Sequence, residues 1–234
     1  MKKVLMVVTG AQYWTLKDGT RHPTGFWAEE FLVPYETFLS AGYDITIATP
    51  DAQIPVVDQL SLGLRGGVTP GTAQRFRARL RDLAPILNNP ADLAQIDQGQ
   101  YDLVFYPGGH GPMEDLAFNT TSAAILNARL ASGRPLALLC HAPAALLATA
   151  IDAPSSSFAG RKVTGLSNVE ERINPFGWKA SWLLEDKLKE MGMQYSKGFP
   201  LRPHVVVDGN LYTGQNPQSS KKLAETLVHD LQRL

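Results

Sequence analysis

The chain has 234 residues, of which 44% are hydrophobic, so it is long and apolar enough for one large domain with a buried core. Its 22 lysines and arginines balance 22 aspartates and glutamates, which leaves no basic field for a nucleic-acid backbone. We therefore expect no nucleic-acid partner. A single cysteine excludes an internal disulfide and favours a reducing, cytoplasmic location. No apolar stretch is long enough to span a bilayer, so we expect no membrane partner.

The first part of the chain alternates between strand and helix patterns. Residues 3–8 form a continuous apolar run of strand length, too short for a signal peptide. Residues 26–40 carry apolar side chains at helical spacing, and residues 44–48 predict a second strand. A strand, a helix and a strand in this order indicate a parallel pair joined by a crossover helix.

Residues 49–100 are less regular and contain several turn signals around a basic helix predicted over residues 74–83. The segment is too short and too polar for a core of its own. We interpret it as an insertion that covers one end of the sheet. The whole chain, residues 1–234, is then predicted to be a single domain.

The alternation of strands and helices resumes after residue 100. We predict strands at 103–106, 135–139 and 162–164, helices at 121–131, 144–150, 181–191 and 218–231, and a hairpin of 205–207 with 211–213. The sum is an α/β fold with a doubly wound, mainly parallel sheet and helices on both faces.

Cys140 directly follows the apolar strand predicted at 135–139, and Pro143 suits the first turn of a helix. Ligands of open parallel sheets gather at the carboxyl ends of the strands, so this turn resembles a nucleophile elbow. A helix N-terminus stabilises a thiolate by about 0.3–2 kcal/mol, roughly one unit of pKa, so full activation needs a second helper. An inert buried cysteine is the alternative interpretation.

Two neighbouring turns offer backbone donors. The imidazole of His141 is a candidate base beside Cys140, but adjacent side chains on a sharp turn often point apart, so its backbone N–H is the better placed group, in an oxyanion hole. A histidine stacked in the interface is the alternative interpretation of the side chain. Gly108 and Gly109 follow the strand predicted at 103–106 and allow a backbone N–H to approach a reacting oxygen closely. A tight strand-to-helix connection is the structural alternative for these glycines.

Several acids are candidate partners of the cysteine. Glu30 is spaced to look inward from its helix, where burial would raise its pKa and keep it protonated as a proton shuttle. Glu170 and Glu171 follow the strand at 162–164, and either can orient a histidine or lie on a surface loop. His22 and His204 show no metal-ligand spacing and Cys140 has no cysteine partner, so we assign no metal.

Four segments of the sequence together resemble the DJ-1/PfpI superfamily, and most closely its Hsp31-like branch, described as class I glutamine amidotransferase-like. They are Thr-Gly-Phe-Trp-Ala-Glu-Glu at 24–30, Pro-Gly-Gly-His-Gly at 107–111, Leu-Leu-Cys-His-Ala-Pro at 138–143 and Thr-Gly-Gln-Asn-Pro at 213–217. The resemblance extends over nearly the whole chain. It implies a three-layer, flavodoxin-like sandwich with Cys140 on the elbow.

The resemblance also implies roles for individual residues. Cys140 and His141 match the elbow cysteine and the histidine after it. Glu30 matches the helix glutamate that touches the cysteine, with Glu29 the weaker candidate. Glu171 fits the third acid of the branch best, with Glu170 a near alternative. Gly109, with Gly108 beside it, matches the turn on the oxyanion side.

Members similar to this branch are glutathione-independent glyoxalases, which convert methylglyoxal to lactate without a cofactor. The resemblance therefore implies a cysteine-dependent lyase of the D-lactate dehydratase type, acting on a small aldehyde, and relatives are often homodimers. True glutamine amidotransferases carry glycines around the elbow cysteine and a late His-x-Glu pair, and this chain has neither. The alternatives are a hydrolase or hydratase acting on another small electrophile, a stress-protective holdase chaperone and a redox sensor.

Overall fold

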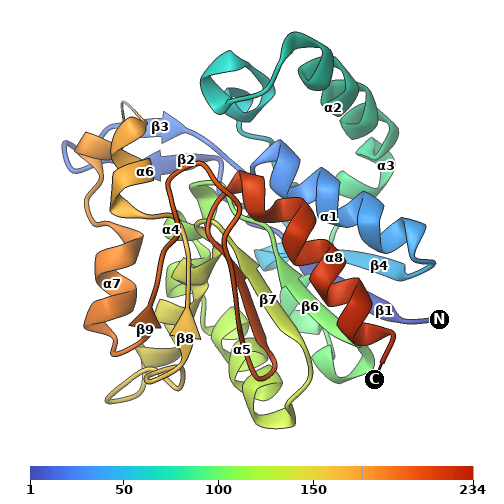
Figure 1. Ribbon diagram of the computed structural model, residues 1–234, viewed down its shortest axis with the longest axis vertical. Helices are drawn as coiled ribbons and strands as arrows, with labels where there is room; N and C mark the ends of the chain where they lie inside the picture. Colours follow the sequence, from blue (N-terminus) through green and yellow to red (C-terminus); the bar gives the residue numbers. More distant parts are fainter. Residues whose placement is uncertain (175, 234) are drawn as a thin grey trace.

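The computed structural model describes residues 1–174 and 176–233, and in them the main sheet has seven strands in the order β10-β11-β7-β6-β1-β4-β5 (Figure 1). The strands are β1 (Lys3–Val7), β4 (Asp44–Thr49), β5 (Ala91–Asp92), β6 (Leu103–Tyr106), β7 (Leu136–Leu139), β10 (Val205–Asp208) and β11 (Leu211–Gly214). All neighbours are parallel except β10 and β11, which form the predicted antiparallel hairpin. The predicted α/β class with a mainly parallel sheet is confirmed.

Helices cover both faces of this sheet (Figure 1). The α-helices are α1 (Ala28–Ser40), α2 (Pro70–Asp82), α3 (Ala84–Leu87), α4 (Gly111–Glu114), α5 (Thr120–Ser132), α6 (Asn168–Ile173), α7 (Leu184–Glu190) and α8 (Ser220–Leu231). The 3₁₀ helices are η1 (Pro50–Ala52), η2 (Gln59–Leu62), η3 (Leu64–Gly66), η4 (Leu93–Gln95), η5 (Gln98–Gln100), η6 (Leu116–Phe118), η7 (Ala142–Ala150), η8 (Gly177–Lys179) and η9 (Pro217–Ser219). Helices α1 and α8 pack together on one face, and α5 lies with η7 on the other.

The two faces divide the core because successive side chains of a strand point to opposite sides. In β1, Val4 and Met6 pack into the cluster beneath α1 and α8. Leu5 and Val7 of the same strand pack into the cluster beneath α5 and η7. Burial on both faces explains why this strand is apolar throughout rather than alternating.

Two features differ from the expectations. The hairpin of β2 (Tyr13–Thr15) and β3 (Arg21–Pro23) was not predicted. The strand expected at 162–164 is β8 (Lys162–Val163), and it pairs with β9 (Gln194–Tyr195) outside the main sheet. Strands this short are below the length at which periodicity gives a signal.

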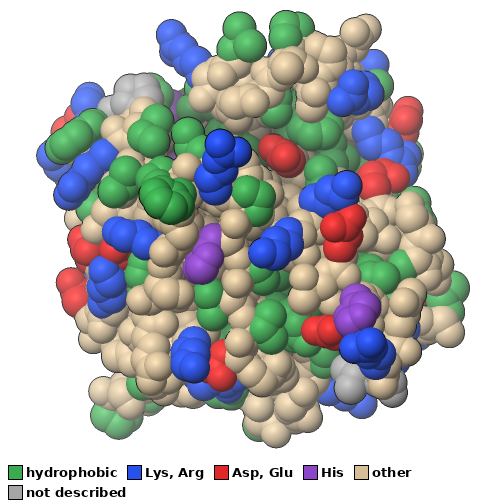
Figure 2. All heavy atoms as spheres, viewed as in Figure 1, with side chains coloured by type: hydrophobic (Ala, Val, Ile, Leu, Met, Phe, Trp, Pro, Cys, Tyr) green, Lys and Arg blue, Asp and Glu red, His purple; other side chains and the backbone are tan. Residues whose placement is uncertain are grey.

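The segment 49–100 contributes to the main sheet, because β5 pairs with β4 at the edge. The basic helix expected at 74–83 is α2, and it begins earlier because Thr69 accepts a hydrogen bond from the N–H of Thr72 and Pro70 occupies the first turn. On the face seen in Figure 2, cationic and anionic side chains are interspersed rather than segregated. Among the described residues, no helix combines the length and the apolar character needed to cross a bilayer.

Candidate active site

Cys140 stands at the carboxyl end of β7 with a backbone φ of +60°, a left-handed conformation that is uncommon for a residue with a side chain. Its N–H donates to the carbonyl of Gly214 at 2.8 Å, and its carbonyl accepts from the N–H of Leu166 at 2.9 Å. A residue in such a conformation costs about 1–3 kcal/mol, and these two hydrogen bonds help to hold the turn in place. The strand-turn-helix arrangement expected here is present, with η7 as the helix, a 3₁₀ rather than an α-helix.

The Cys140 thiol lines a cavity of about 720 Å³. The inner end of the cavity is formed by buried polar side chains, namely Glu30, His110, Cys140, His141, Glu170 and Glu171. The outer walls include the apolar side chains of Leu64, Ile173 and Leu201. Ligand pockets typically enclose about 300–1,000 Å³, so this volume suits a small organic molecule.

Glu30 reaches the same cavity from α1 and is fully buried. Its Oε2 accepts a hydrogen bond from the N–H of Gly108 at 2.9 Å, and its Oε1 has no hydrogen-bond partner. The carboxyl and the Cys140 thiol interact with opposite effects: Glu30 raises the pKa of the thiol, whereas the thiol lowers the pKa of Glu30 and only partly offsets the effect of burial. Burial raises the pKa of Glu30 well above its usual range, which favours the protonated acid. Glu29 is only partly buried and does not line the cavity.

The electrostatics of Cys140 differ from the expected resting thiolate. Burial is the main cause that raises the pKa of the thiol well above its usual range, and the neighbouring Glu30 adds to it. The dipole of a short helix is too weak to offset full burial beside a carboxyl group. This direction favours the protonated thiol, which must lose its proton as it reacts.

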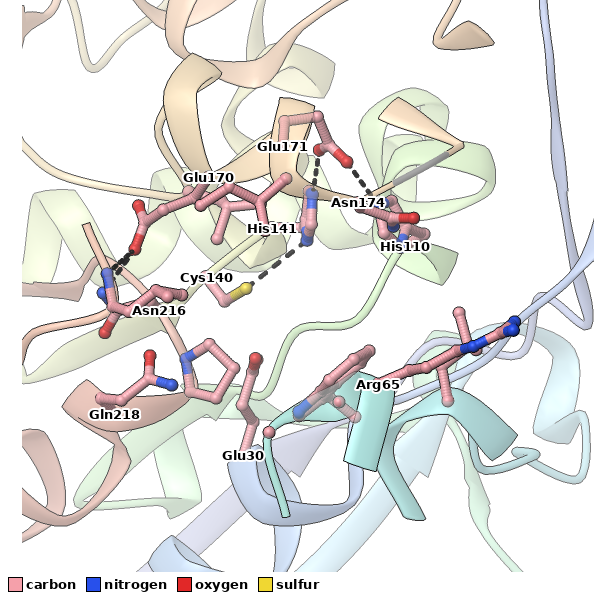
Figure 3. Close-up of a pocket in the computed structure, with 18 of the residues that line it drawn as sticks. Glu30, Arg65, His110, Cys140, His141, Glu170, Glu171, Asn174, Asn216 and Gln218 are labelled. Atoms are coloured by element: carbon pink, nitrogen blue, oxygen red, sulfur yellow. Dashed lines mark hydrogen bonds and ion pairs between the residues drawn. The ribbon is translucent and has the colours of Figure 1, made fainter. Parts of the chain in front are cut away.

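The sequence left open whether the His141 side chain lies beside Cys140 or points away from it. The ring lies against the thiol, with Nδ1 3.4 Å from Cys140 Sγ (Figure 3). The other nitrogen, Nε2, is 2.5 Å from Oε2 of Glu171. Sulfur, imidazole and carboxylate thus form a continuous chain in which a proton can leave the thiol and the resulting charge is offset.

Glu170 and Glu171 both lie buried on α6, not on a surface loop. Glu171 faces the histidines, whereas Glu170 turns the opposite way toward Asn216 (Figure 3). Glu170 also accepts hydrogen bonds from Gln215, from the N–H of Leu201 and from Ser167, with which it forms a capping box. Of the two acids left open by the sequence, the structure brings only Glu171 to His141.

His110 was not singled out as a side chain by the sequence analysis, which considered only the glycines around it. Its Nε2 lies 2.8 Å from Oε1 of Glu171, so one carboxylate contacts two imidazole rings. Its other face stacks on Trp14 with ring centroids 4.2 Å apart. The signal that could have found it is its position: His110 directly follows the glycine turn after β6, the strand that pairs with β7.

The glycine turn after β6 lies against the elbow. A Cβ atom on Gly108 would lie 2.5 Å from Glu30 Oε2 and 2.9 Å from the backbone nitrogen of His141. Gly109 has a φ of +104°, and a Cβ there would meet the carbonyl of Gly25 at 2.4 Å. Only glycine fits either position. The N–H of Gly108 is already given to Glu30, so it is not free for a substrate oxygen.

Within residues 1–174 and 176–233, the one cluster with spacing suited to a metal ion is made of His110, His141 and Glu171. Both histidine Nε2 atoms already contact the carboxylate at hydrogen-bond distance. Hydrogen bonding alone accounts for their spacing, and we assign no metal to the cluster.

Comparison with solved structures agrees with the fold. Rapid Encystment Protein 24 KDa (REP24) of Francisella tularensis is 27% identical and superposes with a TM-score of 0.84, covering 99% of both chains. The glyoxalase III of Candida albicans is 24% identical with a TM-score of 0.79, covering 97% of this chain and 96% of that one, and at this identity it shows a shared fold.

Sequence comparison covers nearly the whole chain. The protein/nucleic acid deglycase HchA of Pseudomonas aeruginosa (strain UCBPP-PA14) is 29% identical over 247 aligned residues, covering 98% of this chain and 81% of that protein. A family model described as DJ-1/PfpI family matches residues 23–230, a range that holds Glu30, Cys140 and Glu171. The resemblance seen in the motifs is confirmed, and the chain belongs to the DJ-1/PfpI family.

Proposed function

We propose that this protein converts small 2-oxoaldehydes such as methylglyoxal to 2-hydroxy acids, with Cys140 as the nucleophile and without glutathione or another cofactor. The observation that carries the proposal is the Cys140 thiol at the base of a cavity, between the Glu30 acid and a histidine that a carboxylate orients. The 29% identical relative named as a deglycase supports carbonyl chemistry. A lone cysteine that must stay reduced supports a reducing compartment such as the cytoplasm.

The first step forms a bond between sulfur and the aldehyde carbon. The thiol proton passes to Nδ1 of His141, 3.4 Å away, as sulfur attacks and the carbonyl electron pair moves onto oxygen. Glu30 then gives its proton to that oxygen, which completes a hemithioacetal. The N–H groups of Gly109 and His141 are the proposed donors to the substrate oxygens.

The next steps move hydrogen from one substrate carbon to the other. The Glu30 carboxylate removes the hydrogen of the former aldehyde carbon, and His141 protonates the ketone oxygen, which yields an enediol. Glu30 returns a proton to the second carbon while His141 takes the hydroxyl proton, which leaves a thioester. Water then attacks the thioester, Glu30 takes its proton, and His141 protonates the departing sulfur. The product is a hydroxy acid, and all three residues regain their starting states.

A second candidate function is deglycation, the activity named for the Pseudomonas relative. The cavity of about 720 Å³ is much larger than a three-carbon aldehyde requires, so it has room for an adduct on a larger group. That relative's name includes nucleic acid, and the exclusion of nucleic acid drawn from the neutral charge is therefore unsupported.

The test is lactate formation from methylglyoxal by purified protein without glutathione. Cys140→Ser should abolish turnover while the protein stays folded. Because Cys140 is the only cysteine of the chain, alkylation at one equivalent should inactivate the protein in proportion to the modified fraction. Full activity of Cys140→Ser would overturn the mechanism. Release of free amine and lactate from a methylglyoxal–amine adduct, without lactate formation from free methylglyoxal, would favour deglycation.

A further inference from the structure

One buried carboxylate in the site serves two imidazole rings. Glu171 Oε2 lies 2.5 Å from His141 Nε2, and Glu171 Oε1 lies 2.8 Å from His110 Nε2. All three side chains are at most 5% exposed. The two rings are themselves in contact, with centroids 4.1 Å apart. A triad with one histidine needs no such second ring, so the role of His110 calls for an explanation.

The charge of this cluster limits how many protons it holds. One imidazolium neutralises Glu171, whereas two imidazolium ions 4.1 Å apart in a buried site would repel each other and leave a net charge. One of the two rings is therefore positive and the other neutral. The location of this charge affects the Cys140 thiol, because His141 is the ring of the two that contacts Cys140.

The surroundings favour the positive charge on His110. Its ring stacks on Trp14 with centroids 4.2 Å apart and planes 18° apart, a geometry in which an aromatic face stabilises a cation. His141 has no such stack, and its second nitrogen faces a neutral thiol. Burial lowers the pKa of both rings and Glu171 raises both; with Asp58 added, the pKa of His110 is raised, whereas the neighbouring His110 leaves the pKa of His141 lowered.

We propose that His110 is a positioning residue that carries the positive charge opposite Glu171 in the resting protein and thereby keeps His141 a neutral base toward Cys140. The titratable groups that face His110 are Glu171 from α6, His141 from the elbow, Asp58 from the start of η2 and His22 from β3. His141 additionally faces Cys140 and Glu170. The inference rests on the proposed role of Cys140, but its test follows the thiol and not the turnover.

The sign of the effect follows from removing His110. Glu171 would then have His141 as its remaining imidazole partner, and the charge would move to His141. An imidazolium 3.4 Å from Cys140 Sγ stabilises the thiolate. His110→Gln should therefore lower the pKa of the Cys140 thiol, even though the substitution removes a positively charged imidazole from the site.

The experiment measures alkylation of Cys140 by iodoacetamide between pH 5.5 and pH 9, followed by intact mass, with protein treated with EDTA. We expect His110→Gln to react about tenfold faster than the natural protein at pH 7, the change that one pKa unit produces. His22→Gln is the matched control, since His22 faces His110 but does not contact Glu171, and its profile should be unchanged. An unchanged or slower rate in folded His110→Gln would overturn the proposal.

A second measurement needs no substitution. Nitrogen-15 chemical shifts of the histidine rings in the natural protein at pH 7 should show both nitrogens of His110 protonated and Nδ1 of His141 unprotonated. The opposite assignment would overturn the proposal even if His110→Gln fails to fold. If the predicted shifts are observed but no lactate forms, the proposed function is contradicted and the inference about His110 is still supported.

Discussion

The carboxyl of Glu30 accepts a hydrogen bond of 2.9 Å from the backbone N–H of Gly108, which joins the first helix of the fold to the turn after β6. The bond fixes one oxygen of the acid and leaves the other, Oε1, without a partner beside the cavity. A buried carboxyl held this way is preorganised to exchange a proton with whatever enters. Its chemical and structural roles can be separated by experiment.

Glu30→Gln should keep the shape of the site while removing the proton shuttle. Its amide oxygen can still accept from Gly108, so we expect the fold to survive and the turnover of methylglyoxal to fall by about 10²–10⁴-fold. Glu29→Gln is the matched control, because Glu29 is the adjacent acid on the same helix and does not line the cavity. Equal activity in the two variants would remove Glu30 from the mechanism.

Glu30 should also make stability depend on pH. Burial raises its folded-state pKa, so the folded protein holds this proton more tightly than the unfolded chain. Stability should then fall as pH rises above the ordinary carboxyl pKa, whereas Glu30→Gln has nothing to titrate there. In urea denaturation from pH 4.5 to pH 8, the variant should gain stability relative to the natural protein. A constant difference across this range would show that Glu30 is ionised in the folded state.

Gly108→Ala should damage both the fold and the chemistry. Its Cβ would lie 2.5 Å from Glu30 Oε2 and 2.5 Å from the carbonyl of Leu139, contacts that real Cβ atoms do not make. We expect a loss of about 1–3 kcal/mol in the free energy of unfolding, together with loss of lactate formation. Gly71→Ala in α2 meets no atom within 4 Å and should be neutral or stabilising. Urea denaturation of the pair checks this, and equal stability would contradict it.

Glu170→Gln and Glu171→Gln should fail in different ways although the residues are adjacent. Glu170 accepts from the amides of Gln215 and Asn216, so an amide in its place should cost about 1–3 kcal/mol of stability and leave most activity. Glu171→Gln removes the charge opposite the histidines and should lower turnover by about 10²–10⁴-fold. Thermal unfolding and lactate formation are measured on both variants. Glu170→Gln should lose mainly stability and Glu171→Gln mainly activity, and identical losses in the two variants would refute the assignment.

The elements with a clear pattern were predictable from the sequence. The apolar run of β7 followed by Pro143 indicated the turn that holds Cys140, and the hairpin of β10 and β11 followed from Asp208-Gly209. The helix that carries Glu30 followed from its apolar stripe. These features depend on local spacing, which the sequence contains directly.

The parts that depend on distant contacts were not predictable. Spacing could not choose between Glu170 and Glu171, because the choice rests on which way α6 turns as it packs over the elbow. The raised pKa of Cys140 depends on burial by segments far apart in the chain. The role of His110 required knowing that two turns meet at one carboxylate.

Part of the cavity wall comes from a different stretch of chain than the reacting groups. Leu60, Leu64 and Gly67 belong to the segment 49–100, whereas Cys140 and His141 lie at the end of a central strand. Changes in that segment can alter which molecule enters without moving a nucleophile, an acid or a base. If the proposed function holds, substitutions in this segment should alter the preference for one aldehyde over another while the chemistry is retained.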